Sequence, residues 1–527
     1  MSEFIGTLYE TVSLSRVKFS TKPGGSVRVG TLVQIGEGKD KQLGRVIYGE
    51  RKNYLIDQDG AVQLSSLFEE HKSMDAQTIG IRGEFRDYIV GEIEIIGRRK
   101  KNSFKRPDTP LKIGEKIFKA EKNFIDQQIK PEGKTVSIGS FRIDKNVNVY
   151  LDINELITKH FCVLAMTGAG KSWAISVLIE ELALNYDIPI VIFDPHGEYS
   201  SLSSLENPKG ESIIKKVKIY VTADDIMKKN LDELFFEKFS VKRISHRLCV
   251  NIADLETYQI INVLTHLHDL AEAQKRILQA GWSNIRKKPS LLSTTNLDDI
   301  IKELSTVAQE VTRGTASAHI LKAKMELFFN KAPFIRKSPT DPKIDINEIV
   351  KKGQITVIDM SGMELIYQQV LIAIIANKIL QGRMNREIPP VLTIFEEAHR
   401  FIPSGAGLNA SKPTLKKIAQ EGRKFLMGLG IISQRPSRVD SDVLSQCNTQ
   451  IILRLTNPND QTYVKNISEH VTAPDLEEIK ALSPGEAYIF GSAVPLSLPI
   501  KISEKRYTKH GGYTPEIISE LDKYKEI

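Results

Sequence analysis

Cysteine and tryptophan are scarce in this 527-residue chain, with three and two copies. Cys162, Cys249 and Cys447 stand far apart in the sequence, which excludes a disulfide framework and a zinc site built from cysteines. Such sparse cysteine usage is typical of a reducing compartment. We therefore expect a cytoplasmic protein.

Long apolar runs are also missing. No stretch of eighteen consecutive apolar residues occurs, so we predict no transmembrane helix and no membrane partner. The first ten residues, MSEFIGTLYE, lack the basic start and apolar stretch of a signal peptide. The formal net charge of +8 permits a polyanionic partner, but ordinary surface lysines explain it equally well.

The clearest motif that is present is a glycine-bearing loop at 165–172, AMTGAGKS, between an apolar run and a segment with helical periodicity. Strand, loop and helix in this order are the context that a phosphate-binding P-loop requires. Gly168 and Gly170 let the backbone close around phosphates because glycine has no Cβ. Lys171 would reach the outer phosphates, and the Ser172 hydroxyl would hold Mg²⁺. The candidate nucleotide-binding residues are Thr167, Gly168, Ala169, Gly170, Lys171, Ser172 and Trp173.

One position departs from the usual P-loop pattern. The motif normally begins with glycine, where this chain has Ala165. A methyl group is tolerated there if the φ angle of Ala165 is negative. The alternative interpretation is a helix N-terminus that follows a chance Gly-Lys-Ser.

Two further apolar strands end in polar residues that suit nucleotide chemistry. The strand at 390–395 precedes Glu396 and Glu397, and P-loop enzymes use one such acid for Mg²⁺ and another for the attacking water. We predict Glu396 as the Mg²⁺ ligand, although aspartate is usual there, and Glu397 as the general base; two surface glutamates are the alternative. After the strand at 428–433, Gln434 is predicted to sense the γ-phosphate through the lytic water.

The strand at 188–193 also ends in polar side chains, Asp194, His196 and Glu198. Ligands of open α/β sheets bind beyond the carboxyl ends of the strands. We therefore expect these residues near the nucleotide or its metal. Either they orient a water or ligand, or they only stabilise the turn.

The sequence pattern divides the chain into two regions of different secondary structure. Residues 1–145 carry short apolar or alternating runs between glycine-rich turns, which predicts a small N-terminal β-barrel. From 146 onward strands alternate with helices, which predicts an α/β core with a parallel sheet. We expect this core at 146–222 and 351–504, interrupted by a helical insertion at 223–350. A C-terminal tail at 505–527 follows.

Two surface segments carry ambiguous signals. The basic cluster at 98–101 and 105–106 suits contact with nucleic acid or another subunit, but a solvated charge run is the other interpretation. The loop at 403–413 is rich in small residues and flanked by lysine, which suits sequence-independent phosphate contacts. An ordinary surface loop is the alternative.

Taken together, the segments MTGAGKS, IFDPHGEY, IFEEAHRFIP and EGRKF…GIISQRPS resemble the HerA family, within the HerA/FtsK group of ring-forming P-loop translocases. The resemblance covers nearly the whole chain, and the N-terminal barrel is similar to the family's HAS barrel. It implies a RecA-like core and a homohexamer that binds ATP at each subunit interface and double-stranded DNA in a central pore. It also identifies Arg423 as the arginine finger of a neighbour's site, with Arg435 and Arg400 as other candidates. The alternative for Arg423 is an exposed helix arginine.

This resemblance implies an ATP-driven DNA helicase or translocase that acts with a separate effector. The effector would be a nuclease such as NurA in end processing and repair, or a nuclease or sirtuin-like protein in antiviral defence. The family tail often lies over a neighbour's nucleotide site, and here it carries Tyr507, Lys509 and Tyr513, although a frayed terminus is the alternative. The second hypothesis is a nucleotide-dependent ring scaffold with little translocation. A small-molecule P-loop kinase is disfavoured by the chain's size and its barrel.

Overall fold

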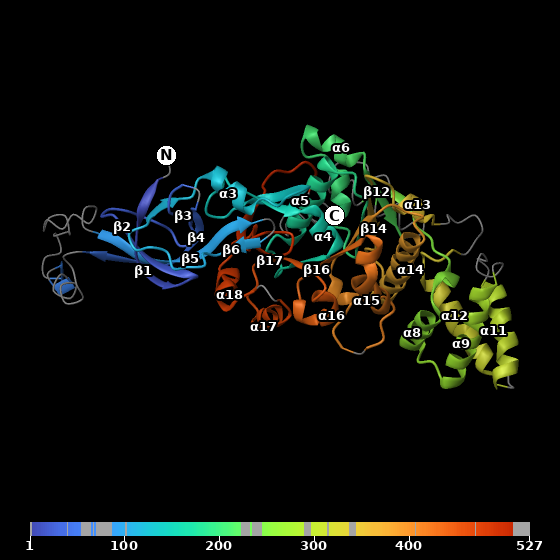
Figure 1. The fold of residues 1–527 in the computed structure, drawn as a ribbon. Helices are drawn as coiled ribbons and strands as arrows, with labels where there is room; N and C mark the ends of the chain where they lie inside the picture. The colour runs from blue at the N-terminus through green and yellow to red at the C-terminus, as the bar shows by residue number, and fades with distance from the viewer. Residues whose placement is uncertain are drawn as a thin grey trace. The chain divides into compact units, whose positions relative to one another are not determined.

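The computed structural model describes residues 3–509 apart from Lys39, 54–64, Leu67, 70–86, 101–102, 223–231, 234–244, 289–296, 313–315, 337–343, Ala406 and 469–470. Parts of the predictions on the basic cluster, at Lys101, and on the tail, at Tyr513, therefore lie outside the described residues, as does Ala406 of the loop at 403–413. The chain divides into two compact units (Figure 1). The first unit consists of Met1–Thr135, Gly139–Tyr150 and Val494–Leu496, and the second of Val136–Ile138, Leu151–Ala493 and Ser497–Ile527.

The first unit is an antiparallel barrel. Its sheet has the order β2-β1-β7-β3-β4-β5-β6, and β2 also pairs with β5, which closes six of the strands into a ring. Side chains at alternate positions along the strands point inward and form its core, and Val17, Phe19 and Ile93 among them are fully buried. The predicted N-terminal barrel is confirmed. Its elements are β1 (Phe4–Ser13), β2 (Arg16–Thr21), β3 (Leu32–Ile35), β4 (Gln42–Asn53), β5 (Asp87–Lys100), β6 (Ser103–Lys105), β7 (Lys116–Lys119) and α3 (Lys122–Ile129).

The second unit is built on a mixed sheet. Its strands follow the order β13-β12-β14-β11-β15-β16-β10-β17-β18-β19, parallel as far as β17 and antiparallel from there on. The strands are β10 (Phe161–Leu164), β11 (Ile190–Asp194), β12 (Val217–Val221), β13 (Ser245–Arg247), β14 (Ile355–Asp359), β15 (Val391–Phe395), β16 (Met427–Ser433), β17 (Thr449–Leu453), β18 (Glu486–Gly491) and β19 (Leu498–Ile502). Strands β8 (Thr135–Phe141) and β9 (Asn148–Asp152) span the sequence boundaries between the units. The central strands are buried on both faces, as the continuous apolar runs predict.

Helices cover this sheet and extend from it. The longer ones are α5 (Lys171–Asn185), α8 (Thr257–His268), α9 (Glu272–Lys287), α11 (Leu297–Thr312), α12 (Ala316–Lys331), α14 (Leu365–Met384), α15 (Lys412–Glu421), α17 (Pro458–Ile467) and α18 (Ala473–Lys480). The shorter ones are α4 (Ile153–Thr158), α6 (Glu211–Ile214), α13 (Ile346–Ile349) and α16 (Ser441–Leu444), with 3₁₀ turns at Tyr199–Ser203, Pro208–Gly210, Ile252–Asp254, Ala398–Arg400, Gly422–Phe425 and Pro436–Arg438. Helices α8, α9, α11 and α12 lie together as a bundle (Figure 1), and the α/β fold class with its inserted helices is confirmed.

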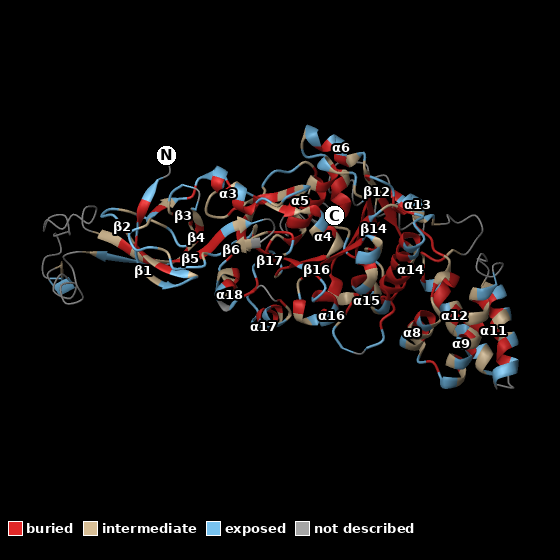
Figure 2. Cartoon of the chain, in the orientation of Figure 1, coloured by how far each residue is buried: buried red, intermediate tan, exposed pale blue. Residues whose placement is uncertain are grey.

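Helix α14 is the one described helix that is long and apolar enough to cross a membrane. Within the protein 78% of its apolar window is buried, and Figure 2 shows it mostly in the colour of buried residues. Residues such as Leu371, Ile375 and Ile379 pack into the core of the second unit. Helix α14 is therefore a core helix that packs between other elements.

One predicted helix ends earlier than expected. The sequence pattern predicts a helix from Leu415 to Phe425, but α15 ends at Glu421, and Gly422–Phe425 form a 3₁₀ turn. A Cβ at Gly422 would lie 2.7 Å from the Met427 carbonyl oxygen, so the chain turns back closely on itself there. Leu426 then adopts a left-handed conformation, with φ of 56°, which directs the chain into β16.

Candidate active site

The P-loop connects the end of β10 to the start of α5. Gly168 and Gly170 have φ angles of 79° and 96°, values that glycine adopts without strain, as expected for a loop that closes tightly. Gly170 is the N-cap of α5 and provides no side-chain cap, and the first N–H groups of the helix point out of its N-terminus. Ala165 is fully buried and is not among the residues with positive φ, which explains why a methyl group replaces the usual glycine.

The ammonium group of Lys171 lies between two carboxylates at the end of β15. Its Nζ contacts Oε1 of Glu396 and lies 3.0 Å from Oε1 of Glu397. The three side chains are no more than 7% exposed. Burial strengthens an interaction between opposite charges because water screens it less. The structure thus brings together residues that are 225 and 226 positions apart in the sequence.

Glu397 is held in an unusual conformation by several contacts. Its φ and ψ angles of 51° and 44° lie in the left-handed region, which costs a residue other than glycine about 1–3 kcal/mol. The Gln434 amide donates to Oε1 of Glu397 at 2.5 Å, and Thr167 of the P-loop donates to the other end of that amide at 2.5 Å. His399 lies 3.2 Å from Oε2, and its other neighbour is the Ser433 hydroxyl. Burial lowers the pKa of His399, while the charge of Glu397 opposes that shift.

The polar end of β11 contributes a second set of oxygens. Ser172 donates to the Glu198 carboxylate at 2.5 Å, and the buried Tyr199 hydroxyl donates to Glu396 at 2.8 Å. Burial raises the pKa of Tyr199 well above its usual value, and the charge of Glu198 adds to the effect. The sequence indicated Glu198 as a site residue because it follows an apolar strand, whereas no sequence pattern indicated Tyr199.

Asp194 itself stabilises the turn. Its carboxylate accepts hydrogen bonds from the backbone amides of His196 and Tyr199, at 3.2 and 2.8 Å. Burial, together with the charge of Asp359 on the adjacent strand, raises the pKa of Asp194 to about 7. His196 lies 3.3 Å from the guanidinium of Arg400. Of the two interpretations left open for this strand end, turn chemistry fits Asp194, while Glu198 contacts the P-loop serine.

Trp173 contacts the start of the C-terminal tail, for which the family resemblance implies a place over a neighbour's nucleotide site. Its indole N–H donates to the carbonyl oxygen of Ser503 at 2.9 Å. The guanidinium carbon of Arg506 lies over the indole ring, 4.1 Å from its centroid. The C-terminal end of the described chain therefore reaches the first turn of α5.

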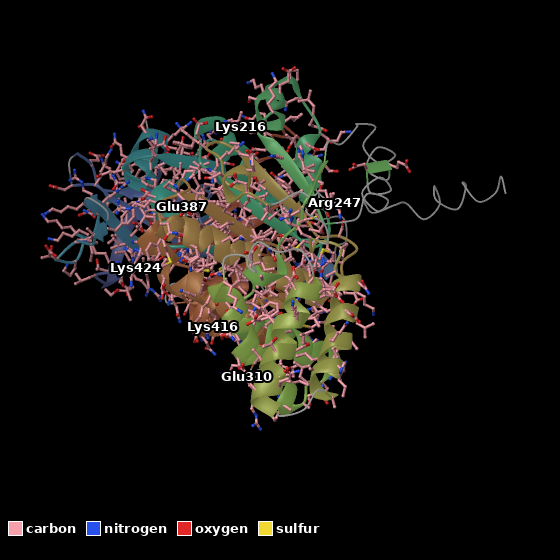
Figure 3. The ribbon with its side chains drawn as sticks, turned by 90° about the vertical axis from the view of Figure 1, so that its right-hand side faces the viewer. Lys216, Arg247, Glu310, Glu387, Lys416 and Lys424 are labelled. Carbon is pink, nitrogen blue, oxygen red and sulfur yellow. The ribbon has the colours of Figure 1, made fainter. Side chains whose placement is uncertain are left out.

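Arg423 does not join this cluster within its own chain. It is exposed in the 3₁₀ turn that precedes β16, whereas Gln434 follows the end of that strand. Seven residues of strand separate them by about 20 Å, at a rise of about 3.3 Å per residue. Lys424 beside it is also exposed (Figure 3). Arg435 is likewise exposed, next to Gln434.

The loop at 403–413 is braced from inside. The ammonium of Lys412 donates to the carbonyl oxygens of Pro403 and Gly405, both at 2.7 Å, and lies 2.9 Å from a carboxylate oxygen of Asp440. Burial favours the neutral acid at Asp440, but Lys412 and Lys416 outweigh it and lower the pKa of that carboxyl. Lys412 therefore ties the two ends of the loop together and to Asp440.

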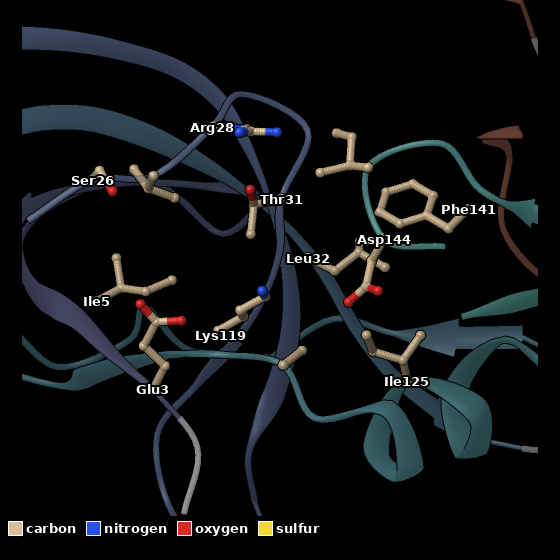
Figure 4. Close-up of a pocket in the computed structure, with 13 residues that line it drawn as sticks. Glu3, Ile5, Ser26, Arg28, Thr31, Leu32, Lys119, Ile125, Phe141 and Asp144 are labelled. Atoms are coloured by element: carbon tan, nitrogen blue, oxygen red, sulfur yellow. The ribbon is translucent and has the colours of Figure 1, made fainter. Parts of the chain in front are cut away.

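The barrel unit contains a cavity of about 360 Å³ (Figure 4). Apolar side chains such as Leu32 and Phe141 line it together with charged groups such as Arg28 and Lys119. Part of the basic cluster in the same unit forms ion pairs within the chain. Lys105 pairs with Asp108, for example, 2.9 Å away.

A comparison with protein families matches residues 136–379 to the family described as "Helicase HerA, central domain". The DNA double-strand break repair helicase HerA of Pyrococcus furiosus is 27% identical over 582 aligned positions, which cover all of this chain and 98% of that protein. A probable helicase of Methanocaldococcus jannaschii is 30% identical over 395 positions, covering 70% of this chain and 71% of that one.

Among solved structures, VirB4 of Thermoanaerobacter pseudethanolicus is similar to this chain with a TM-score of 0.51. The similarity covers 71% of this chain and 98% of VirB4, at 14% sequence identity. At that identity the similarity shows a shared fold. It agrees with the α/β architecture of the second unit.

Proposed function

Because this chain belongs to the HerA helicase family, an ATPase family of the helicase class, we propose that it is a ring-forming motor that hydrolyses ATP to move along double-stranded DNA. One observation carries the proposal. Lys171, Glu396 and Glu397 form a buried cluster at the N-terminus of α5, and the half-buried Gln434 is hydrogen-bonded to it. This set provides a cation for phosphate, acids for a metal and a water, and an amide to orient that water.

The P-loop amides and Lys171 bind the triphosphate. The N–H groups at the start of α5 and the helix dipole favour an anion at that place. The Lys171 ammonium is paired with two carboxylates in this structure, so phosphate oxygens must compete with these carboxylates for it. Binding therefore rearranges the ion pairs and frees Glu397 to face the lytic water.

Glu397 acts as the general base. A carboxylate at hydrogen-bond distance from a water can take its proton as it attacks phosphorus. The Gln434 side chain donates to Glu397 through its NH₂ group and accepts from Thr167 of the P-loop through its oxygen, so its amide links the base to the phosphate loop. Gln434 thereby orients the water with respect to the γ-phosphate.

Mg²⁺ fits the oxygens around Ser172. The ion prefers hard oxygen ligands, and the Ser172 hydroxyl, Glu198 and Glu396 supply a hydroxyl and two carboxylates. Ser172 and Glu396 would hold the ion, directly or through water, and Glu198 would orient the hydroxyl. When bound, Mg²⁺ neutralises charge on the transferring phosphoryl group.

We infer the DNA contacts and the assembly from the resemblance to the family. Six copies would form a ring around the duplex, with Arg423 reaching a neighbour's nucleotide. The loop at 403–413 would contact phosphates through its backbone amides, since Lys412 is engaged inside the loop. Relatives are named for DNA double-strand break repair, so we place this chain in DNA end processing with a separate NurA-like nuclease. A role in antiviral defence stays a prediction.

The experiment that tests this function is ATP hydrolysis with and without linear duplex DNA, combined with native mass measurement. We expect hexamers, stimulation by DNA, and loss of turnover in Lys171→Ala. Lys171→Ala protein that hydrolyses ATP like the parent would exclude the proposed site. A ring that binds nucleotide and assembles an effector without any DNA stimulation would support the scaffold hypothesis instead.

A further inference from the structure

The last described residues, 503–509, form a segment that we call the C-terminal strap. It is anchored on α5 by Glu180, a carboxylate that is 1% exposed. Glu180 accepts hydrogen bonds from the backbone amides of Tyr507 and Thr508 at 3.2 and 2.6 Å, and from the Thr508 hydroxyl at 2.7 Å. A buried carboxylate that accepts three hydrogen bonds holds its partners firmly, because leaving it unpaired is costly.

The strap is fixed from its other side as well. Thr508 forms a β-bridge with Leu205, and the Glu206 amide donates to the Tyr507 carbonyl oxygen at 3.1 Å. A Cβ at Gly210 would lie 2.1 Å from that same oxygen, so the strap approaches a place that only glycine leaves open. The strap is therefore packed and hydrogen-bonded as part of the second unit.

The strap places Arg506 on Trp173. The Trp173 indole N–H donates to Ser503, where the strap begins, and the Arg506 guanidinium covers the ring at 4.1 Å. Trp173 directly follows Ser172, the proposed Mg²⁺ ligand. A planar guanidinium supported on an aromatic ring offers its second face to another flat group.

The topology of the sheet places this pair at one end of the nucleotide site. The carboxylates lie on β15, on one side of β10, whereas β17 and β18 lie on the other side. On that other side the Gly485 amide donates to Ala169 of the P-loop at 3.2 Å, and the Ile502 amide donates to Gly485 at 2.9 Å. The strap follows Ile502 immediately, so it leaves from the flank of the P-loop that faces away from Glu396 and Glu397.

We propose that Arg506, supported by Trp173 and held by the strap, stacks on the base of the bound nucleotide. This inference rests on the proposed ATPase function. With the terminal phosphate at Lys171 and the carboxylates, the nucleoside end points toward the flank where the strap begins. Bases stack on guanidinium planes, and stacking contributes to affinity without requiring one particular base. Arg506 is thus a binding residue for the nucleoside, and the P-loop binds the phosphates.

The test compares two probes by calorimetry in the presence of Mg²⁺: a non-hydrolysable ATP analogue and inorganic tripolyphosphate. Arg506→Ala should lower the affinity for the ATP analogue by at least about fivefold, the loss expected for one stacked base. Its affinity for tripolyphosphate should be unchanged. Arg506→Lys keeps the charge but lacks the planar group, so it should behave like Arg506→Ala. Lys505→Ala, the exposed neighbour in the strap, is the matched control and should bind both probes normally.

The outcomes separate this inference from the proposed function. Parent protein that binds neither probe would contradict the nucleotide site itself. Normal binding by the parent with no change in Arg506→Ala would overturn the base-stacking role alone. An equal loss of affinity for both probes in Arg506→Ala would also overturn it, because the residue would then act on the phosphates. Gly210→Ala displaces the strap, and we expect it to reproduce the selective loss.

Discussion

The side-chain amide of Gln434 donates to the carboxylate of Glu397 at 2.5 Å, so an amide at the end of β16 holds the acid at the end of β15. The contact constrains a residue whose backbone is already in the left-handed region. A P-loop threonine binds the opposite end of the same amide. Gln434 therefore makes the position of the proposed base depend on the state of the phosphate loop.

The first prediction separates these two residues. Glu397→Gln should lower kcat for ATP hydrolysis by about 10²- to 10⁴-fold, the usual contribution of a general base, while nucleotide still binds. Gln434→Ala should lower kcat by about 10- to 100-fold, because it loses one hydrogen bond to a charged group. Both are measured by steady-state turnover together with nucleotide affinity. Gln446→Ala, at an exposed glutamine, is the control, and wild-type turnover in Gln434→Ala would contradict the orienting role.

The second prediction concerns Arg423, which lies too far from its own P-loop to act there. Arg423→Ala and Lys171→Ala should each be inactive alone. Mixed rings should regain hydrolysis, since some interfaces then join an intact P-loop to an intact finger from the neighbour. Lys424→Ala, at the adjacent exposed residue, should remain active by itself. Mixtures that stay inactive despite forming hexamers would assign Arg423 to the surface.

Sequence patterns were sufficient for the strands and for the loop between them. The apolar runs at 161–164, 188–193 and 390–395 contain fully buried parallel strands, because a strand covered on both faces needs continuous apolar residues. Side chains that follow such strands meet at one edge of the sheet. That rule is why Lys171, Glu396, Glu397 and Gln434 could be grouped without a structure.

Other contacts could not be predicted from local pattern. Tyr199 contacts Glu396, and Arg506 contacts Trp173, through tertiary packing between segments far apart in the sequence. The end of α15 at Glu421 depends on Gly422 meeting the following strand, which helical periodicity does not record. The left-handed backbone conformation of Glu397 could not be predicted from the sequence either, since glutamate rarely adopts it.

The third prediction tests the oxygens around the metal site. Glu198→Gln removes the carboxylate that accepts the Ser172 hydroxyl at 2.5 Å. Loss of a residue that orients a metal ligand typically costs 10- to 100-fold in metal affinity, so half-maximal ATPase activity should require about that much more Mg²⁺. A titration of Mg²⁺ at saturating ATP measures it. Glu211→Gln, an exposed acid on α6, is the control, and an unchanged Mg²⁺ requirement in Glu198→Gln would contradict the assignment.

The last prediction follows from His160, a histidine buried just before β10. Its Nδ1 accepts the Leu429 amide at 3.1 Å, so Nε2 carries the proton and donates to the Ala419 carbonyl oxygen at 3.2 Å. Burial lowers the pKa of His160 from 6.5 to about 4, and the charge of Arg423 lowers it as well, against the opposing effect of the Ala419 hydrogen bond. The folded protein therefore keeps this ring neutral in a pH range where the unfolded chain protonates it.

The sign of the effect on stability follows directly. Above pH 6.5 the ring is neutral in both states, and between 6.5 and about 4 only the unfolded chain gains a proton, so the free energy of unfolding falls as the pH falls. The contribution lost between pH 7 and pH 5 is about 2 kcal/mol, at about 1.4 kcal/mol per unit. Urea unfolding at both pH values measures it. His160→Asn should be less stable at pH 7 but show a shallower fall, and His319→Asn, at an exposed position, should keep the parent's slope; equal slopes in His160→Asn and the parent would contradict this origin.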